Sequence, residues 1–152
     1  MRAALKANQR TRHLLRSPAV GTPPLTGREG PTLLAFLTTT CASCQPFWEM
    51  MAVDLPGRDL GIPVVVVTPS PSTEDERLAR RLVPAGARLH MSSETWFAYG
   101  VGQAGTFVLA AGAAGGPPVW EQPGEVLGWA SLEAPSDLAP LLQAWHGKCL
   151  GP

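Results

Sequence analysis

The segment Ile62–Thr68 contains four consecutive valines and is closed by Pro69 and Pro71. β-Branched residues favour extended backbone, and an uninterrupted apolar run is typical of a strand that is buried on both faces. Such strands occur mainly in parallel sheets whose two faces are covered by helices. The valines therefore predict an interior strand of a parallel part of a sheet.

Strand and helix patterns alternate on either side of this run. The apolar run at 32–38 predicts a second buried strand, Thr73–Glu76 resembles a helix capping box, and Ser136 is the expected N-cap of the last helix. We expect further strands at 88–91, 106–111 and 119–122, with 126–129 open between strand and loop, and helices at 41–53, 74–82, 93–99 and 136–145. This order predicts an α/β fold with a mixed central sheet and helices on both faces.

Length and charge suggest one domain with two tails. The 152 residues fit a single core, which we place at 31–146, with a basic tail and linker at 1–30 and a short tail at 147–152. A short basic helix is expected at 3–15. Six cations precede the first acid, Glu29, and no aromatic residue lies between them: Arg2, Lys6, Arg10, Arg12, Arg16 and Arg28. A solvated tail is therefore expected, and nucleic-acid binding is not.

No segment is apolar for long enough to span a membrane, and residues 1–30 lack the apolar region of a secretory signal. The literal expectation is a cytoplasmic protein. A chain trimmed of an anchor, working outside the cytoplasmic membrane, would have the same sequence pattern.

Cys41 and Cys44 follow the first predicted strand and begin the first predicted helix of the domain. A helix N-terminus offers unpaired N–H groups and partial positive charge, which favour a thiolate at Cys41. Cys44, one turn on, would face inward within reach of the sulfur of Cys41. The pair predicts thiol–disulfide exchange, with Cys41 as the nucleophile and Cys44 as the resolving thiol.

Two other interpretations of the pair stay open. A zinc site needs four ligands, and the plausible additions are Cys149, His90 and His146. Alternatively, the pair forms a static structural disulfide. Cys149 is expected after the last helix as a free tail thiol, and His90 and His146 are expected at the surface.

The run Pro31–Cys44 resembles the strand and active-site helix of thioredoxin-like proteins, and Tyr99–Leu109 resembles the segment that leads into their third main strand. Val20–Pro24 is similar to the lead-in of the TlpA-type branch of bacterial thiol–disulfide oxidoreductases. The resemblance implies a three-layer α/β/α thioredoxin-like fold. It also implies substrate contacts around the cysteines and at the third strand: Thr40, Ala42, Ser43, Gly105 and Thr106.

The sequence departs from that family at several positions. Gly105 stands where the family has a cis-proline, and Thr40 stands where it has a tryptophan. Ala35 replaces the buried acid of thioredoxin itself, and Glu49 is a substitute only if it does not face solvent. These departures motivate a second hypothesis, a thioredoxin fold with inefficient turnover that serves as a binding or metal-handling module.

A third hypothesis is a peroxiredoxin-like peroxidase, because Thr38–Cys41 has that family's Thr-x-x-Cys pattern. Its proline is replaced by Leu34, and no arginine follows Arg88. The first hypothesis is a TlpA-type disulfide reductase that needs no cofactor beyond the cysteine pair. Its partners would be a disulfide or thiol substrate and a recycling reductant, which can be membrane-bound. The aromatic residues Trp96, Phe97 and Tyr99 are interpreted as core, or else as a groove beside the site.

Overall fold

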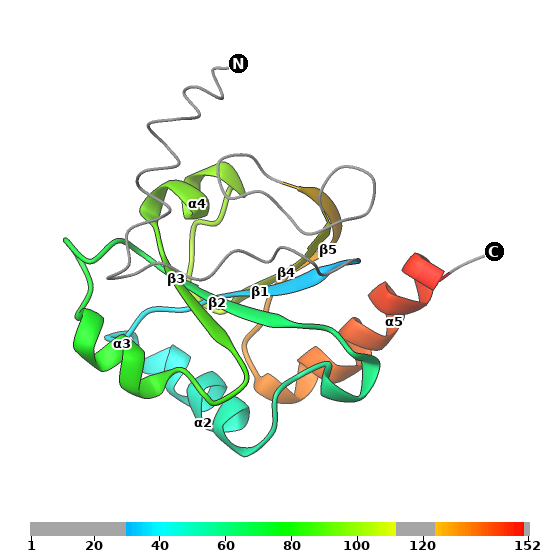
Figure 1. The fold of residues 1–152 in the computed structure, drawn as a ribbon, viewed down its shortest axis with the longest axis horizontal. Helices are drawn as coiled ribbons and strands as arrows, with labels where there is room; N and C mark the ends of the chain where they lie inside the picture. Colours follow the sequence, from blue (N-terminus) through cyan, green and yellow to red (C-terminus); the bar gives the residue numbers. More distant parts are fainter. Residues whose placement is uncertain (1–29, 112–123, 151–152) are drawn as a thin grey trace.

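The computed structural model describes residues 30–111 and 124–150. The expected basic tail, the connection at 112–118 and the strand at 119–122 lie outside these ranges. The described chain forms one five-stranded sheet in the order β3-β2-β1-β4-β5 (Figure 1). Its strands are β1 (Thr32–Phe36), β2 (Val64–Thr68), β3 (Arg88–Met91), β4 (Thr106–Ala111) and β5 (Glu125–Ser131).

The sheet is mixed, as predicted. β1 pairs with β2 and β2 with β3 in parallel, whereas β4 is antiparallel to both β1 and β5. The valine run forms β2, lies between two parallel neighbours and is buried throughout. The segment at 126–129, which the sequence left open, lies within the edge strand β5.

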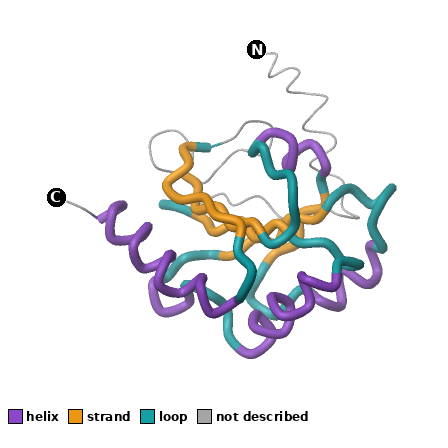
Figure 2. The backbone as a smooth tube through the Cα atoms, turned by 180° about the vertical axis from the view of Figure 1, so that it is seen from behind, coloured by secondary structure: helices purple, strands orange, loops and turns teal. Residues whose placement is uncertain are grey.

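Helices cover both faces of the sheet (Figure 2). We name one side the α2/α5 face; it is covered by α2 (Gln45–Val53), α3 (Glu76–Leu82) and α5 (Leu138–Leu150). The other side, the α4 face, is covered by α4 (Ser93–Ala98). Short 3-10 turns are η1 (Ala42–Cys44), η2 (Arg58–Leu60) and η4 (Pro135–Asp137).

Alternation along β1 divides the core between these faces, because successive strand residues point to opposite sides. Leu33 and Ala35 belong to the cluster on the α2/α5 face, with Phe47 and Trp145. Leu34 and Phe36 belong to the cluster on the α4 face; its other members are Val65, Val67, Tyr99, Val101, Val108 and Ala110. The three-layer α/β/α architecture follows from this two-sided burial.

The predicted starts of α3 and α5 are wrong. α3 begins at Glu76, and its N-cap is Asp75, whose carboxylate accepts a hydrogen bond from the Leu78 amide at 3.0 Å. The residues before it form a turn in which the Thr73 amide donates to the Ser70 carbonyl. Near the end of the chain, Ser136 lies inside η4, so α5 begins at Leu138 rather than at a serine cap.

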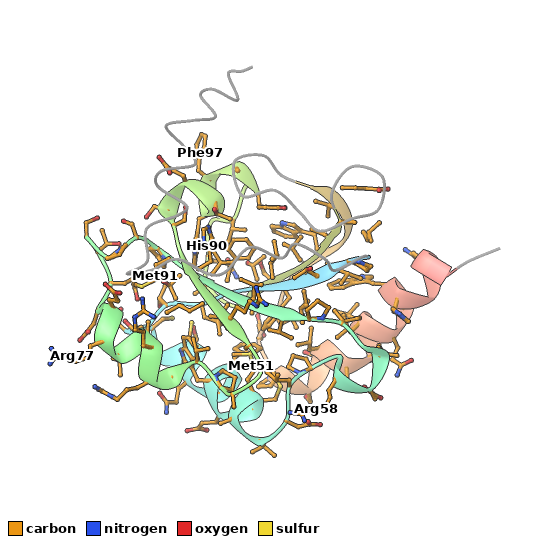
Figure 3. All side chains as sticks on the ribbon, viewed as in Figure 1. Met51, Arg58, Arg77, His90, Met91 and Phe97 are labelled. Carbon is orange, nitrogen blue, oxygen red and sulfur yellow. The ribbon has the colours of Figure 1, made fainter. Side chains whose placement is uncertain are left out.

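The last helix is longer than expected, because α5 continues to Leu150 and therefore includes the backbone of Cys149. His90 is not a surface residue. It is 4 % exposed on β3, points into the α4 face, and its Nε2 lies 3.1 Å from the Thr95 hydroxyl (Figure 3). Within residues 30–111 and 124–150, no helix is both long and apolar enough to cross a bilayer.

Candidate active site

Cys41 and Cys44 lie where β1 leaves the sheet and the first helical turn begins. The α-helix does not start at Cys41, as the sequence suggested, but is preceded by η1. Cys41 is the N-cap of this 3-10 turn, and its carbonyl accepts the Cys44 amide at 3.0 Å. Cys44 in turn is the N-cap of α2. The two cysteines thus occupy consecutive helix starts.

The sulfur of Cys41 is partly exposed and has polar neighbours. Its Sγ lies 2.9 Å from the Ser43 hydroxyl. The Ser43 hydroxyl and then the Ser43 amide lower the pKa of the Cys41 thiol, helped by the thiol and amide of Cys44 and opposed by partial burial. A lowered pKa raises the thiolate fraction near neutral pH, and the thiolate is the nucleophilic form.

The sulfur of Cys44 has the opposite environment. Cys44 is 1 % exposed and packs with Phe47 and Trp48 in the core of the α2/α5 face. Burial raises the pKa of the Cys44 thiol, and the amide and hydroxyl of Thr38 partly offset this effect. Both cysteines are free thiols. The pair therefore combines an accessible, acidic thiol with a protected, less acidic one.

Thr38 contacts both cysteines from the end of β1. Its hydroxyl accepts the Cys41 amide at 3.2 Å and lies 3.9 Å from the Cys44 sulfur. Its amide donates to the same sulfur at 3.5 Å, and its carbonyl accepts the indole N–H of Trp48 at 3.1 Å. Sequence reasoning considered Thr38 only as part of a peroxidase pattern and missed this role.

Glu74 is a second residue that sequence reasoning did not place at the site. Its Oε1 accepts hydrogen bonds from the Thr39 amide at 2.8 Å and from the Thr39 hydroxyl at 2.7 Å. The available signal was topological: parallel strands β1 and β2 end at the same edge of the sheet, so the loops that follow them are neighbours. The carboxylate ties the loop before Cys41 to the loop before α3.

The predicted substrate contacts divide into two groups. Thr40, Ala42 and Ser43 are exposed around Cys41. Gly105 and Thr106 are buried at the start of β4, next to the end of β1. Their roles in substrate binding stay predictions.

Gly105 adopts a φ of +90°, which favours glycine, and no cis peptide bond occurs among the described residues. The Gly105 amide donates to the Phe36 carbonyl at 2.8 Å, and the Gly105 carbonyl accepts the Leu132 amide at 2.9 Å. The Thr106 hydroxyl donates to the Gln103 carbonyl and lies 2.7 Å from the Ser131 hydroxyl. At the position where the family has a cis-proline, the amide and the carbonyl of Gly105 therefore both form hydrogen bonds to other backbone groups of the protein.

Ala35, which stands where thioredoxin has a buried acid, is fully buried in the core of the α2/α5 face, and no Asp or Glu is buried among the residues that the structure describes. Glu49 is exposed on α2 and accepts a hydrogen bond from Gln45 at 3.1 Å. In the part of the chain that the structure describes, no cluster of three or more His, Cys, Asp or Glu residues is arranged to hold a metal ion.

The aromatic residues near α4 are mainly core. Trp96 meets Phe36 edge-on, with ring centroids 5.5 Å apart, and its indole donates to the Val67 carbonyl at 3.1 Å. Tyr99 is 7 % exposed in the same cluster. Phe97 differs, because it is 88 % exposed and points away from the body of the protein (Figure 3).

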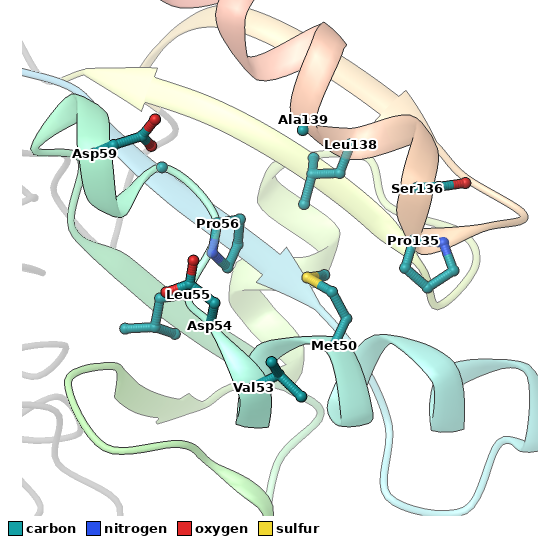
Figure 4. Close-up of a pocket in the computed structure, with 11 residues that line it drawn as sticks. Met50, Val53, Asp54, Leu55, Pro56, Asp59, Pro135, Ser136, Leu138 and Ala139 are labelled. Carbon is teal, nitrogen blue, oxygen red and sulfur yellow. The ribbon is translucent and has the colours of Figure 1, made fainter.

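An open, mostly apolar hollow of about 570 Å³ lies at the other end of α2 (Figure 4). It is lined by Met50 and Val53 of α2, by the loop at 54–57, and by Leu138 and Ala139 of α5. Because the cysteines precede the N-terminus of α2, this hollow is separate from the candidate active site.

Comparison with known proteins identifies the fold. A protein from Chlorobium tepidum, provisionally described as a thiol:disulfide interchange protein DsbE, superposes with a TM-score of 0.55 at 22 % identity, over 82 % of each chain. A SCO1/SenC family lipoprotein from Bacillus anthracis strain Ames has a TM-score of 0.42 at 14 % identity, over 76 % of this chain and 83 % of its own. No family model and no curated protein sequence matches the chain. The protein has a thioredoxin-like fold, with its cysteine pair at the end of β1 and the start of α2.

Proposed function

We propose that the protein is a thiol–disulfide oxidoreductase of the TlpA type, with Cys41 as the nucleophile and Cys44 as the resolving thiol. One observation carries the proposal: Cys41 is accessible with a lowered pKa, while Cys44, one turn further on, is buried with a raised pKa. This asymmetry gives each sulfur a different task. The Chlorobium tepidum protein is provisionally described as a thiol:disulfide interchange protein, which is the same chemistry.

The reaction proceeds in two exchanges. The Cys41 thiolate attacks one sulfur of a substrate disulfide, forms a mixed disulfide and releases the other substrate sulfur as a thiolate, which takes a proton from water. Cys44 then gives its proton to water and attacks the Cys41 sulfur, which leaves a Cys41–Cys44 disulfide and releases the second substrate sulfur as a thiolate. This thiolate also takes a proton from water. An external dithiol reductant returns the pair to two thiols, so no cofactor enters the scheme.

Disulfide reduction is the proposed direction. The reduction potential of the Cys41–Cys44 couple tests it, because a potential below that of the glutathione pool makes the protein an electron donor. A potential well above it would make the protein an oxidant.

The activity test is reduction of insulin by dithiothreitol in the presence of the protein. We expect turnover by the wild type and none by Cys41→Ser, while Cys44→Ser should accumulate a mixed disulfide that mass spectrometry detects. Cys149→Ser is the matched control and should retain wild-type turnover. Absence of turnover in the wild type, together with copurified copper or zinc in metal analysis, would instead identify a metal-handling module.

A further inference from the structure

The environment of Cys44 contains two hydrogen-bond donors from a single residue. The Thr38 amide lies 3.5 Å from the Cys44 sulfur, and the Thr38 hydroxyl lies 3.9 Å from it. Both distances are within the range for hydrogen bonds to sulfur. The Cys41 thiol is a further polar neighbour, and Phe47 and Trp48 from α2 lie in the same apolar cluster as Cys44.

Either the Thr38 hydroxyl or the neutral Cys44 thiol can donate in the contact between them, and the other contact of the hydroxyl leaves it free to donate. The Thr38 oxygen accepts the Cys41 amide at 3.2 Å, and this contact uses a lone pair and not the hydroxyl proton. The proton is therefore available to the Cys44 sulfur. A sulfur that becomes negatively charged accepts such bonds more strongly, because bonds to ionised groups are stronger than neutral ones.

We propose that Thr38 is a catalytic residue of the second exchange, in which its amide and hydroxyl stabilise the thiolate of Cys44 while it attacks the Cys41 sulfur. This inference rests on the proposed function and deepens it. It assigns to Thr38 a selective effect on resolution, because the Cys41 sulfur has its own hydroxyl partner, Ser43, at 2.9 Å.

The step balances without an added reagent. The Cys44 thiol gives its proton to water, and its sulfur forms a bond to the Cys41 sulfur as the mixed disulfide bond breaks. The electron pair of that bond leaves with the substrate thiolate. Thr38 gains and loses nothing; it donates two hydrogen bonds to the sulfur that carries the transient charge.

The main chain holds Thr38 in this position. Its carbonyl accepts the Trp48 indole N–H at 3.1 Å, and the next residue, Thr39, donates twice to Glu74. These contacts fix the segment between β1 and η1 from two sides. A hydroxyl held in this way loses little conformational freedom when charge develops on the sulfur, which is the condition for electrostatic preorganisation.

A small aromatic disulfide, 5,5′-dithiobis(2-nitrobenzoate), separates the two exchanges in time. Attack by Cys41 releases one coloured thiolate, and resolution by Cys44 releases a second. The experiment uses the full chain with Cys149→Ser, so that no third thiol contributes. Wild-type cysteines should give two phases, and Cys44→Ser should give the first phase only.

Thr38→Val removes the hydroxyl but keeps the β-branched shape. We expect the second phase to slow about tenfold, which corresponds to the loss of one hydrogen bond to a charged group. The first phase should slow less, because the Cys41 sulfur keeps its own partner, the Ser43 hydroxyl. Thr38→Ser retains a hydroxyl and should restore most of the second-phase rate. Far-ultraviolet circular dichroism checks that each variant is folded, and Thr38→Ala replaces Thr38→Val if the latter is not.

Three results would overturn the inference. The first is a second-phase rate in Thr38→Val equal to that of the wild type. The second is equal slowing of the second phase by Thr38→Val and Thr38→Ser. The third is equal slowing of both phases in Thr38→Val. Failure of the proposed function looks different, because then the wild-type cysteines would release no second thiolate.

Discussion

Both faces of the sheet bury apolar side chains, but they hold different chemistry. The α2/α5 face contains Cys44 among aromatic and aliphatic side chains, and the accessible Cys41 lies at its edge. The α4 face contains His90, buried beside Thr95. One layer of strands separates the cysteine pair from the buried imidazole. We therefore expect thiol reactivity and acid sensitivity to depend on different groups of the protein.

The largest expected effect comes from Cys41→Ser. Turnover in a disulfide-reduction assay should fall to background, because a serine hydroxyl is not ionised near neutral pH and does not form a mixed disulfide. Acid unfolding, followed by tryptophan fluorescence, should keep its wild-type midpoint. A shifted midpoint would show that the two faces are coupled.

The second-largest expected effect is a loss of unfolding free energy in acid, which we attribute to His90 on the α4 face. Burial lowers the pKa of His90 from its ordinary value of 6.5 to about 4, so between these values the unfolded chain binds more protons than the folded one. Above pH 6.5 the imidazole of His90 is neutral in both states, and its burial then costs no stability by this route. As the pH falls from 6.5 toward 4, protonation of His90 in the unfolded chain lowers the free energy of unfolding. The full loss is about 3 kcal/mol of unfolding free energy.

His90→Gln tests this pH dependence. Urea unfolding at a series of pH values between 7 and 4 should give a flatter profile for the variant than for the wild type. The dithiobis(nitrobenzoate) reaction of Cys41 at neutral pH should be unchanged. Equal pH slopes in the two proteins would remove His90 as the source of the acid sensitivity.

A third, smaller effect concerns packing on the α2/α5 face. A Cβ atom at Gly128 would overlap the indole of Trp145, which packs on β5 from α5. Gly128→Ala should therefore destabilise the protein by about 1–3 kcal/mol, measured by urea unfolding. Gly147→Ala is the matched control, because a Cβ there meets no atom within 4 Å. Similar stability of the two variants would contradict the packing argument.

The smallest effect is electrostatic. Ser43→Ala removes the hydroxyl that lies 2.9 Å from the Cys41 sulfur, so the pKa of Cys41 should rise toward its ordinary value. At pH 7 the thiolate fraction, and with it the alkylation rate, should fall about threefold, a modest change because the bond is exposed to solvent. A pH profile of the iodoacetamide reaction measures this change in a background with both Cys44→Ser and Cys149→Ser, so that Cys41 is the one remaining thiol. An unchanged profile would show that Ser43 does not tune Cys41.

Much of the fold followed from local pattern. Apolar runs located β1 and β2, and the strands expected at 88–91 and 106–111 are β3 and β4. The short helix expected at 93–99 is α4, which ends one residue earlier, at Ala98. The start of α3 was wrong, because Thr73 and Asp75 both suit an N-cap and the chain uses the second. The surface expectation for His90 was also wrong, since the sequence of the edge strand β3 gives no sign of which helix will cover each of its residues.

The sequence by itself determined the order along the chain of the segments that form the candidate site. A buried strand comes first, Cys41 and Cys44 follow it one turn apart, and a helix comes next. Only the tertiary structure decided what surrounds the two sulfurs. Thr38 and Glu74 reach the site because β1 and β2 are parallel and end at one edge, and Gly105 joins them through antiparallel pairing of β4 with β1. Contacts between distant segments depend on register and on which face each side chain occupies, and local spacing carries no record of either.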